Sequence, residues 1–326
     1  MKNLYTFMLP KYLKTYKSGL LEEKVKIAHE ILSSCTLCPR NCRVNRLKDE
    51  KGFCRSGKDL IVSRAVAHFG EEPPISGTSG SGTIFFSNCN LKCIFCQNYQ
   101  ISQLGMGNKV TTEGLADMML SLQNRGVHNI NWVSPTHFLP QILEGLYVAI
   151  GKGLKIPIVY NTGGYDSLEI IKLLDGIVDI YLPDMKYSDN LTAEKLSSAP
   201  DYPKHNQAAI VEMFRQVENL KVDNSKVAVS GLLIRHLILP DDLAGSYNTL
   251  SFLANEISRD VLIGLMSQYH PSYVANKDKR VNRRITGKEY KKVINWAEEL
   301  GFKNYLIQGI DSSELFLPDF EKDQPF

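Results

Sequence analysis

The chain has 326 residues, of which 43% are hydrophobic and 22% are charged, so it can bury one large core. The 38 lysines and arginines nearly balance the 35 aspartates and glutamates, and the net charge of +3 argues against general nucleic-acid binding. No stretch has the pattern of a membrane span or of a secretion signal, so we expect a cytoplasmic protein without a membrane partner. In that compartment, seven cysteines indicate metal or redox chemistry rather than disulfides.

Residues 1–34 carry apolar side chains at helical spacing, beginning with Tyr5 and Leu9, and are expected to form a helical extension outside the main domain. A segment rich in arginine, lysine and glycine follows. Its cysteines are Cys35, Cys38, Cys42 and Cys54. Four thiolates satisfy tetrahedral zinc as well as an iron–sulfur cluster, and their spacing does not decide between the two. Unliganded, reduced thiols are the remaining alternative.

Residues 35–82 are therefore expected to form a metal-binding module that ends in a linker rich in glycine and proline. The linker contains the run EEPPISGTSGSG, whose glycines invite comparison with a phosphate-binding loop. No Gly-Lys-Ser/Thr sequence follows, and the next element is predicted to be a strand rather than a helix. Nucleotide binding by a P-loop is therefore not expected.

A short apolar strand at residues 83–88 leads directly into Cys89, Cys93 and Cys96, which have the spacing C-x3-C-x2-C. Structural zinc takes four protein ligands, whereas a 4Fe-4S cluster held by three cysteines leaves one iron open to an exogenous ligand. No further cysteine or histidine occurs in the ten residues after Cys96. Half of a zinc site and inert core thiols are the alternatives, but the polar residues between the cysteines argue against a core.

From residue 83 to residue 310, short apolar strands alternate with amphipathic helices, a pattern typical of a parallel α/β fold. The expected strand and helix pairs are 83–88 with 112–125, 128–134 with 138–152, 156–161 with 167–174, 177–182 with 192–198, 231–239 with 243–257, and 261–267 with 286–300. A further helix is expected at 203–219. The last helix should begin with a capping box formed by Thr286 and Glu289, and residues 311–326 should form a C-terminal tail.

The cysteine spacing, with the aromatic Phe95 before the third cysteine, resembles the signature of the radical S-adenosylmethionine (SAM) superfamily. The sequences CPRNC and GFCRSG also resemble the N-terminal module of an uncharacterised group of proteins similar to pyruvate formate-lyase activating enzyme. The resemblance implies a partial (β/α)6 barrel over residues 83–310. It further implies a 4Fe-4S cluster that cleaves S-adenosylmethionine to methionine and a 5'-deoxyadenosyl radical, which abstracts hydrogen.

Functional residues of parallel barrels follow the strands. Asp184 and Lys186, after the fourth strand, match the Asp-x-Lys of glycyl-radical activating enzymes, and the resemblance implies that Lys186 pairs with the carboxylate of the cofactor. Arg235, on the fifth strand, matches an arginine that contacts the cofactor. An acid and a base that project together suit a zwitterionic cofactor. A solvated surface ion pair is the alternative.

Other positions are assigned to the cofactor pocket by the same resemblance. Ser134 and Thr136 stand where the superfamily usually has a glutamate that holds the amino group of the cofactor, although Thr136 could simply cap the next helix. Asn161 and Thr162 stand at an Asp-Thr pair that helps to coordinate a monovalent cation. His270 matches a histidine near the cofactor.

Phe95 and Asn98 should line the same pocket because they adjoin the third cysteine of the loop.

The first functional hypothesis is a radical SAM oxidoreductase. The resemblance suggests that it activates a glycyl-radical enzyme, and the alternative substrates are a different protein, RNA or a small metabolite. Flavodoxin or ferredoxin would donate the electron, and the basic loop 276–284 could contact such an acidic partner. The second hypothesis is a non-catalytic iron–sulfur or zinc scaffold, or an electron-transfer protein, that does not bind S-adenosylmethionine.

Overall fold

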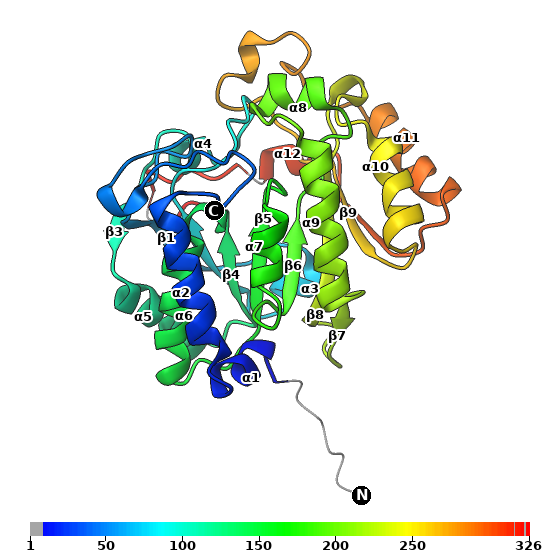
Figure 1. Ribbon diagram of the computed structural model, residues 1–326. Coiled ribbons are helices and arrows are strands. Elements are labelled where there is room, and N and C mark those ends of the chain that lie inside the picture. Colours follow the sequence, from blue (N-terminus) through cyan, green and yellow to red (C-terminus); the bar gives the residue numbers. More distant parts are fainter. Residues whose placement is uncertain (1–8, 316, 323) are drawn as a thin grey trace, which may run out of the picture.

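A computed structural model of this chain describes residues 9–315, 317–322 and 324–326 (Figure 1). The first eight residues, including Tyr5 of the expected N-terminal helix, lie outside the described residues. A ten-stranded sheet forms the centre of the fold. Its strands are β1 (Leu60–His68), β2 (Ser81–Phe86), β3 (Asn108–Val110), β4 (Ile130–Val133), β5 (Ile158–Thr162), β6 (Ile180–Pro183), β7 (Lys221–Val222), β8 (Ala228–Leu237), β9 (Leu262–Met266) and β10 (Tyr305–Ile307).

The strand order is β10-β9-β8-β6-β5-β4-β2-β1-β3, and β7 pairs with β8 outside this path. All pairs from β2 to β10 along this order are parallel, whereas β1 runs antiparallel to β2 and to β3. No pairing between described residues joins β3 to β10, so the sheet is curved but not closed. The prediction of an α/β fold with a parallel partial barrel is confirmed, and the six expected strands are β2, β4, β5, β6, β8 and β9.

Helices cover the outer face of the sheet, and the helices at the N-terminal end pack alongside α6 at the left of Figure 1. The helices are α1 (Lys11–Lys17), α2 (Leu20–Glu30), α3 (Pro73–Ser76), α4 (Tyr99–Ser102), α5 (Thr112–Asn124), α6 (Leu139–Gly151), α7 (Leu168–Leu173), α8 (Asn190–Ser197), α9 (Tyr202–Val217), α10 (Ser246–Phe252), α11 (Gly287–Glu299) and α12 (Ser312–Leu315). The predicted capping box is present at the start of α11. None of the helices within the described residues is long and apolar enough to cross a membrane.

The expected module over residues 35–82 contains a strand that the sequence analysis missed, because residues 60–68 form the long strand β1. The segment LIVSRAVAH contains three β-branched residues, Ile61, Val62 and Val66, which favour an extended strand. Its pairing with β2 adds an antiparallel edge to the barrel. Only the glycine- and proline-rich part, from residue 69 to residue 80, connects the two strands.

This connecting segment crosses the inner face of the barrel, where α3 lies behind β6 and β8 in Figure 1. Ile75 of α3 is fully buried and packs with inward-facing residues of three strands, among them Val159, Ile180 and Leu233. The side-chain amide of Asn129 donates to Ile75 O at 2.8 Å and fixes the segment from the start of β4. The residues just before α3 are thereby held inside the barrel, under the carboxyl ends of the strands.

Candidate active site

The C-x3-C-x2-C motif lies on one loop that leaves the carboxyl end of β2. The amide of Lys92 donates to Ser197 O at 2.9 Å, and the amide of Ile94 donates to Leu196 O at 2.9 Å, so the end of α8 holds the loop. Asn88 turns the chain into the loop with a φ of 67°, a conformation that asparagine adopts more readily than most residues. The loop therefore lies at the edge of the sheet where parallel barrels carry their functional groups.

Each thiol of the loop has a polar neighbour at its sulfur. A backbone amide two residues further on donates to Sγ of Cys89 at 3.4 Å, and the hydroxyl of Ser197 donates to Sγ of Cys93 at 2.9 Å. Sγ of Cys96 lies 3.1 Å from Oγ of Ser102. Hydrogen bonds of this kind stabilise a thiolate and tune a bound cluster. The donor set around the three sulfurs therefore fits an iron–sulfur cluster.

The four N-terminal cysteines are also gathered in one place. Cys35, Cys38, Cys42 and Cys54 line a small cavity of about 10 Å³. Within the described residues, no group of three or more His, Cys, Asp or Glu side chains forms a ready-made site for a single metal ion. The structure thus brings the four thiols together without deciding between zinc and an iron–sulfur cluster.

Arginines join the four-cysteine module to the cysteine loop of the barrel. Arg40 donates from Nε and from Nη2 to Asn90 O, each at 3.1 Å, and its guanidinium lies 3.6 Å from the centre of the Phe53 ring. Arg55 donates to the carbonyl oxygens of Ser102 and Gln103. The two groups of cysteines are therefore held together by directional contacts.

Arg46 anchors the same module from inside the protein. Its side chain is 1% exposed and donates to Gly57 O at 3.0 and 2.7 Å and to His137 O just before α6. A buried guanidinium whose donors are satisfied by carbonyl oxygens is costly to remove, because those carbonyls are left without partners.

We expect Arg46→Met to lower the free energy of unfolding by about 2–4 kcal/mol, since three buried hydrogen bonds are lost. Urea denaturation followed by circular dichroism measures this change. Arg125→Met, at an exposed position after α5, is the matched control and should leave the midpoint unchanged. Equal midpoints for the two variants would contradict the anchoring role of Arg46.

Asp184, just beyond β6, bridges two cations. Its carboxylate lies 2.6 Å from Nζ of Lys186 and 2.8 Å from Nε of Arg235, and the three side chains are only 11%, 15% and 18% exposed. Burial alone would raise the pKa of Asp184, but the charges of Arg235 and Lys186 outweigh burial and lower that pKa. Burial would likewise lower the pKa of Lys186, and the Asp184 carboxylate raises it instead. The alternative of a solvated surface pair is therefore wrong.

Two neighbouring cavities open above this charged group. The smaller, of about 180 Å³, is lined by Cys93, Cys96, Asp184 and Lys186. The larger, of about 400 Å³, extends into the barrel toward α3. The residues that line both cavities are Gln97, Asn98, Arg235, Met266 and Gln268. A ligand bound at the cysteine loop would thus adjoin a second ligand inside the barrel.

Three of the other predicted pocket residues line the smaller cavity. The ring of Phe95 packs edge to face against Tyr269 with 5.5 Å between centroids, and Asn98 reaches both cavities. Nδ1 of His270 lies 3.2 Å from Oγ of Ser272. The structure therefore brings Phe95, Asn98 and His270 together with the cysteine loop.

The structure does not bring Ser134 and Thr136 to either of these cavities. The hydroxyl of Thr136 donates to Oδ1 of the buried Asp166 at 2.6 Å, and the hydroxyl of Thr162 donates to Oδ2 of the same carboxylate at 2.7 Å. Tyr160 adds a third hydroxyl at 3.0 Å. The assignment of Thr136 to the cofactor and of Thr162 to a cation is corrected accordingly, because both hydroxyls donate hydrogen bonds to Asp166.

Asn161 reaches the larger cavity, where it meets a carboxylate that the sequence analysis missed. Its Oδ1 accepts from Nη2 of Arg235 at 2.6 Å, and its Nδ2 donates to Oε1 of Glu71 at 3.4 Å. Oε2 of Glu71 lies 3.5 Å from Nη1 of Arg235. Glu71 and Glu72 were overlooked because they stand in the expected linker; two adjacent acids in an otherwise uncharged glycine- and proline-rich run were the available signal.

A family model described as the radical SAM superfamily matches residues 83–237, which include the cysteine loop and the Asp184 group. An uncharacterized protein of Methanocaldococcus jannaschii is 32% identical to this chain over 296 residues, covering 88% of this chain and 81% of the relative. The chain belongs to the radical SAM superfamily. A second uncharacterized protein of the same organism is 22% identical over 256 residues and covers 73% of this chain and 71% of that relative.

Several solved structures of radical SAM and other proteins are distantly similar. A radical SAM methyltransferase from Sphaerobacter thermophilus is 11% identical, with a TM-score of 0.46, and covers 70% of this chain and 67% of its own. A domain of a pyruvate-formate lyase-activating enzyme from Bacteroides vulgatus is 16% identical, with a TM-score of 0.36. The match covers 50% of this chain and 86% of that domain. Methylornithine synthase is 15% identical, with a TM-score of 0.47. The match covers 95% of this chain and 80% of the synthase. Nothing about substrate follows from similarities this distant.

Membership of the radical SAM superfamily makes this chain an enzyme of radical chemistry that uses a 4Fe-4S cluster and S-adenosylmethionine. The predictions of the superfamily, of this cluster and of this cofactor are therefore confirmed.

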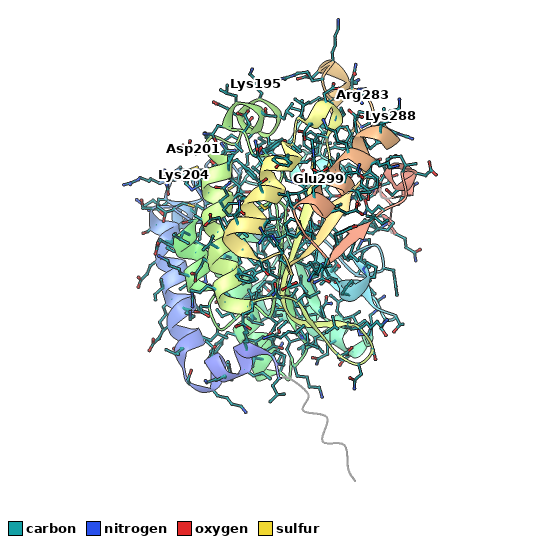
Figure 2. All side chains as sticks on the ribbon, turned by 90° about the vertical axis from the view of Figure 1, so that its right-hand side faces the viewer. Lys195, Asp201, Lys204, Arg283, Lys288 and Glu299 are labelled. Carbon is teal, nitrogen blue, oxygen red and sulfur yellow. The ribbon has the colours of Figure 1, made fainter. Side chains whose placement is uncertain are left out.

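The basic loop at residues 276–284 of this radical SAM protein is partly neutralised by its surroundings. Arg283 lies 2.7 Å from Asp241 and 2.8 Å from Glu289. Figure 2 labels Arg283 in this loop and Lys288 in the first turn of α11. Because Arg283 serves to hold its own segment, the loop offers less positive charge to an acidic partner than the sequence alone indicates.

Proposed function

We propose that this chain cleaves S-adenosylmethionine reductively and directs the resulting 5'-deoxyadenosyl radical at a hydrogen atom of a substrate in the larger cavity. The observation that carries the proposal is the position of the smaller cavity, which is bounded by the cysteine loop on one side and by Asp184, Lys186 and Arg235 on the other. A metal cluster and a zwitterionic cofactor would thus meet in one cavity next to a second, larger one.

Cys89, Cys93 and Cys96 are the proposed ligands of the 4Fe-4S cluster. Three protein ligands leave the fourth iron of such a cluster without a protein ligand. The hydrogen bonds to the three sulfurs and the backbone bonds from the loop to the end of α8 would orient the ligands before metal binds.

Lys186 and Arg235 are proposed to bind the carboxylate of the cofactor, and Asp184 to orient both cations and to contact the ribose or a nearby monovalent cation. The methionine part of the cofactor carries one charge of each sign, and both find an opposite partner in this group. Phe95, Asn98 and His270 would form the walls of the pocket, as their positions in the smaller cavity support.

The four N-terminal cysteines are proposed to hold a second metal centre, either zinc or an iron–sulfur cluster. Their shared cavity and their link to the cysteine loop through Arg40 support this role. Zinc would make the module structural, whereas a cluster would make it an electron relay. Metal analysis of the protein and of Cys38→Ser distinguishes the two: loss of zinc or loss of iron from the variant identifies the centre.

Activation of a glycyl-radical enzyme is the narrower form of the proposal, in which the substrate hydrogen belongs to a glycine of a partner protein and flavodoxin or ferredoxin supplies the electron. Only the resemblance of the Asp184-Met185-Lys186 sequence to the activating enzymes supports it. The larger cavity, of about 400 Å³, favours a small substrate that enters the barrel over one that docks on the surface.

Anaerobic loading of the protein with iron and sulfide, followed by reduction in the presence of S-adenosylmethionine, tests the proposal. We expect 5'-deoxyadenosine and methionine in equal amounts. A scaffold or electron-transfer protein would bind iron and leave S-adenosylmethionine intact, and that result would refute the proposed function.

The assembly of the cluster should accelerate as the pH rises from about 7 to about 9. Burial raises the pKa of Cys89 to about 11 and that of Cys96 to about 12, so these thiols are protonated at neutral pH. Iron binds the thiolate. While the pH stays below these pKa values, each increase of one pH unit should raise the fraction of thiolate about tenfold. The rate at which visible iron–sulfur absorbance appears measures this dependence. In a short peptide with the same three cysteines, the rate should depend less steeply on pH. Equal pH dependences in the peptide and the protein would contradict the effect of burial.

A further inference from the structure

The larger cavity contains charged residues that the cleavage of S-adenosylmethionine does not use. Glu71 and Glu72 stand on its floor, next to α3 and below the Asp184 group. Glu71 is held in place by the amide of Asn131, which donates to its Oε1 at 3.0 Å, and by Arg235 at 3.5 Å. The side chain of Glu71 is 8% exposed, so this carboxylate belongs to the interior of the barrel.

Glu72 differs from Glu71 because one oxygen of its carboxylate lacks a hydrogen-bond donor. Its Oε2 is shielded from solvent and accepts no hydrogen bond from the described residues. Gly264 of β9 faces it, and a methyl group placed on that glycine would come within 3.5 Å of Oε1, so no side chain from β9 covers the carboxylate. A buried acceptor without a donor costs free energy, and such groups concentrate at binding sites.

Acidic side chains outnumber basic ones in the two cavities. Glu71, Glu72 and Asp184 provide three carboxylates, and Arg235 and Lys186 provide two cations. Burial raises the pKa of Glu72 to about 7, although the charge of Arg235 acts in the opposite direction. A cationic group next to Glu72 would favour its ionised form and supply the missing hydrogen bond.

The remaining walls of the larger cavity restrict the ligand further. Phe85, Leu306 and Phe326 provide apolar surface above the carboxylates. The volume of about 400 Å³ is that of a site for a small molecule. A ligand with an aliphatic stem and a cationic end fits the apolar upper wall and the acidic floor together.

We propose that Glu71 and Glu72 form the recognition site for the ammonium or guanidinium group of a small aliphatic substrate. This inference rests on the proposed function, because the smaller cavity must hold the cofactor for the larger one to hold the substrate. Glu72 accepts hydrogen bonds from the cationic group, and Glu71, fixed between Asn131 and Arg235, supplies the second carboxylate. The cationic end thus points to the floor, and the stem of the substrate points toward the cysteine loop.

Isothermal titration of the cluster-loaded protein, with S-adenosylhomocysteine present, tests the inference. The probes are agmatine and cadaverine, which carry cationic ends on aliphatic stems, and glutarate, which carries the opposite charge. We expect both cations to bind and glutarate not to bind. Glu72→Gln should weaken the binding of the cations about tenfold or more, because a charge-assisted hydrogen bond is lost. Glu299→Gln, on the exposed surface of α11, is the matched control (Figure 2) and should bind as the unaltered protein does.

Binding of glutarate in preference to the cations, absence of cation binding up to tens of millimolar, or equal affinities in Glu72→Gln and the unaltered protein would each overturn the inference. If Glu72→Gln does not fold, Glu72→Asp, which keeps the charge on a shorter side chain, takes its place, and unchanged cation affinity in that variant overturns the inference as well. The titration does not depend on turnover. The proposed function fails if the unaltered protein makes no 5'-deoxyadenosine, and the substrate inference fails if the cations do not bind.

Discussion

Replacing Cys93 with alanine should abolish the formation of 5'-deoxyadenosine by the iron-loaded, reduced protein. Cys93 is 7% exposed, accepts a hydrogen bond from Ser197 at 2.9 Å, and lines the cavity proposed for the cofactor. Loss of a residue that only supports a metal ligand typically costs about 10–100-fold in affinity or activity. Loss of a ligand itself should therefore reduce the rate by more than about 100-fold, as measured by chromatography of the reaction products.

Two further variants show whether the effect is specific. Ser121→Ala, on the exposed side of α5, should cleave S-adenosylmethionine at the rate of the unaltered protein. Cys38→Ala should retain measurable cleavage, because its thiol belongs to the separate N-terminal site. Full activity in Cys93→Ala would contradict the role of Cys93 as a cluster ligand. If Cys38→Ala were also inactive, the proposed roles of the two cysteine groups would be reversed.

Asp184→Asn should be the most destabilising conservative substitution in the pocket. The change keeps the shape of the side chain but leaves Lys186 without its carboxylate partner and Arg235 with only the more distant Glu71, at 3.5 Å. Breaking a buried ion pair by removing one partner costs about 3–5 kcal/mol. We expect a loss of that size in the free energy of unfolding, measured by urea denaturation, together with loss of S-adenosylmethionine binding in equilibrium dialysis.

Asp175→Asn provides the matched control, since it removes the same charge from a pair on the surface. Asp175 lies 2.6 Å from Arg215, but the two side chains are 46% and 57% exposed. Solvent screens such a pair, so we expect no measurable change in the denaturation midpoint or in cofactor binding. An unchanged midpoint in Asp184→Asn, as expected for Asp175→Asn, would show that the Asp184 group behaves as an ordinary surface pair.

The sequence was sufficient to predict the elements whose determinants are local. The cysteine loop follows a buried strand, and its ligand spacing is set within eight residues, so Cys89, Cys93 and Cys96 could be grouped without a structure. The alternation of apolar strands and amphipathic helices likewise predicted the parallel sheet. Arg235 and His236 are adjacent on β8, so strand periodicity places them on opposite faces. Arg235 accordingly lines the cavities, and His236 is buried against Met185 O and Ser246 Oγ.

What the sequence could not predict depends on contacts between distant segments. Thr136 was assigned to the cofactor because of its place after a strand, but its hydroxyl is taken by Asp166, thirty positions further on. Glu71 and Glu72 enter the barrel only because Ile75 packs under β5, β6 and β8, and no local pattern in a glycine- and proline-rich run indicates that packing. Such residues become visible only when the fold is known.

The central claim is that one iron of the cluster has no protein ligand and is open to S-adenosylmethionine. Electron paramagnetic resonance of the reduced, iron-loaded protein, recorded with and without S-adenosylmethionine labelled with nitrogen-15 at the amino group, tests it most directly. The account predicts a shifted signal with a hyperfine coupling to the labelled nitrogen. An unchanged spectrum without that coupling would contradict it.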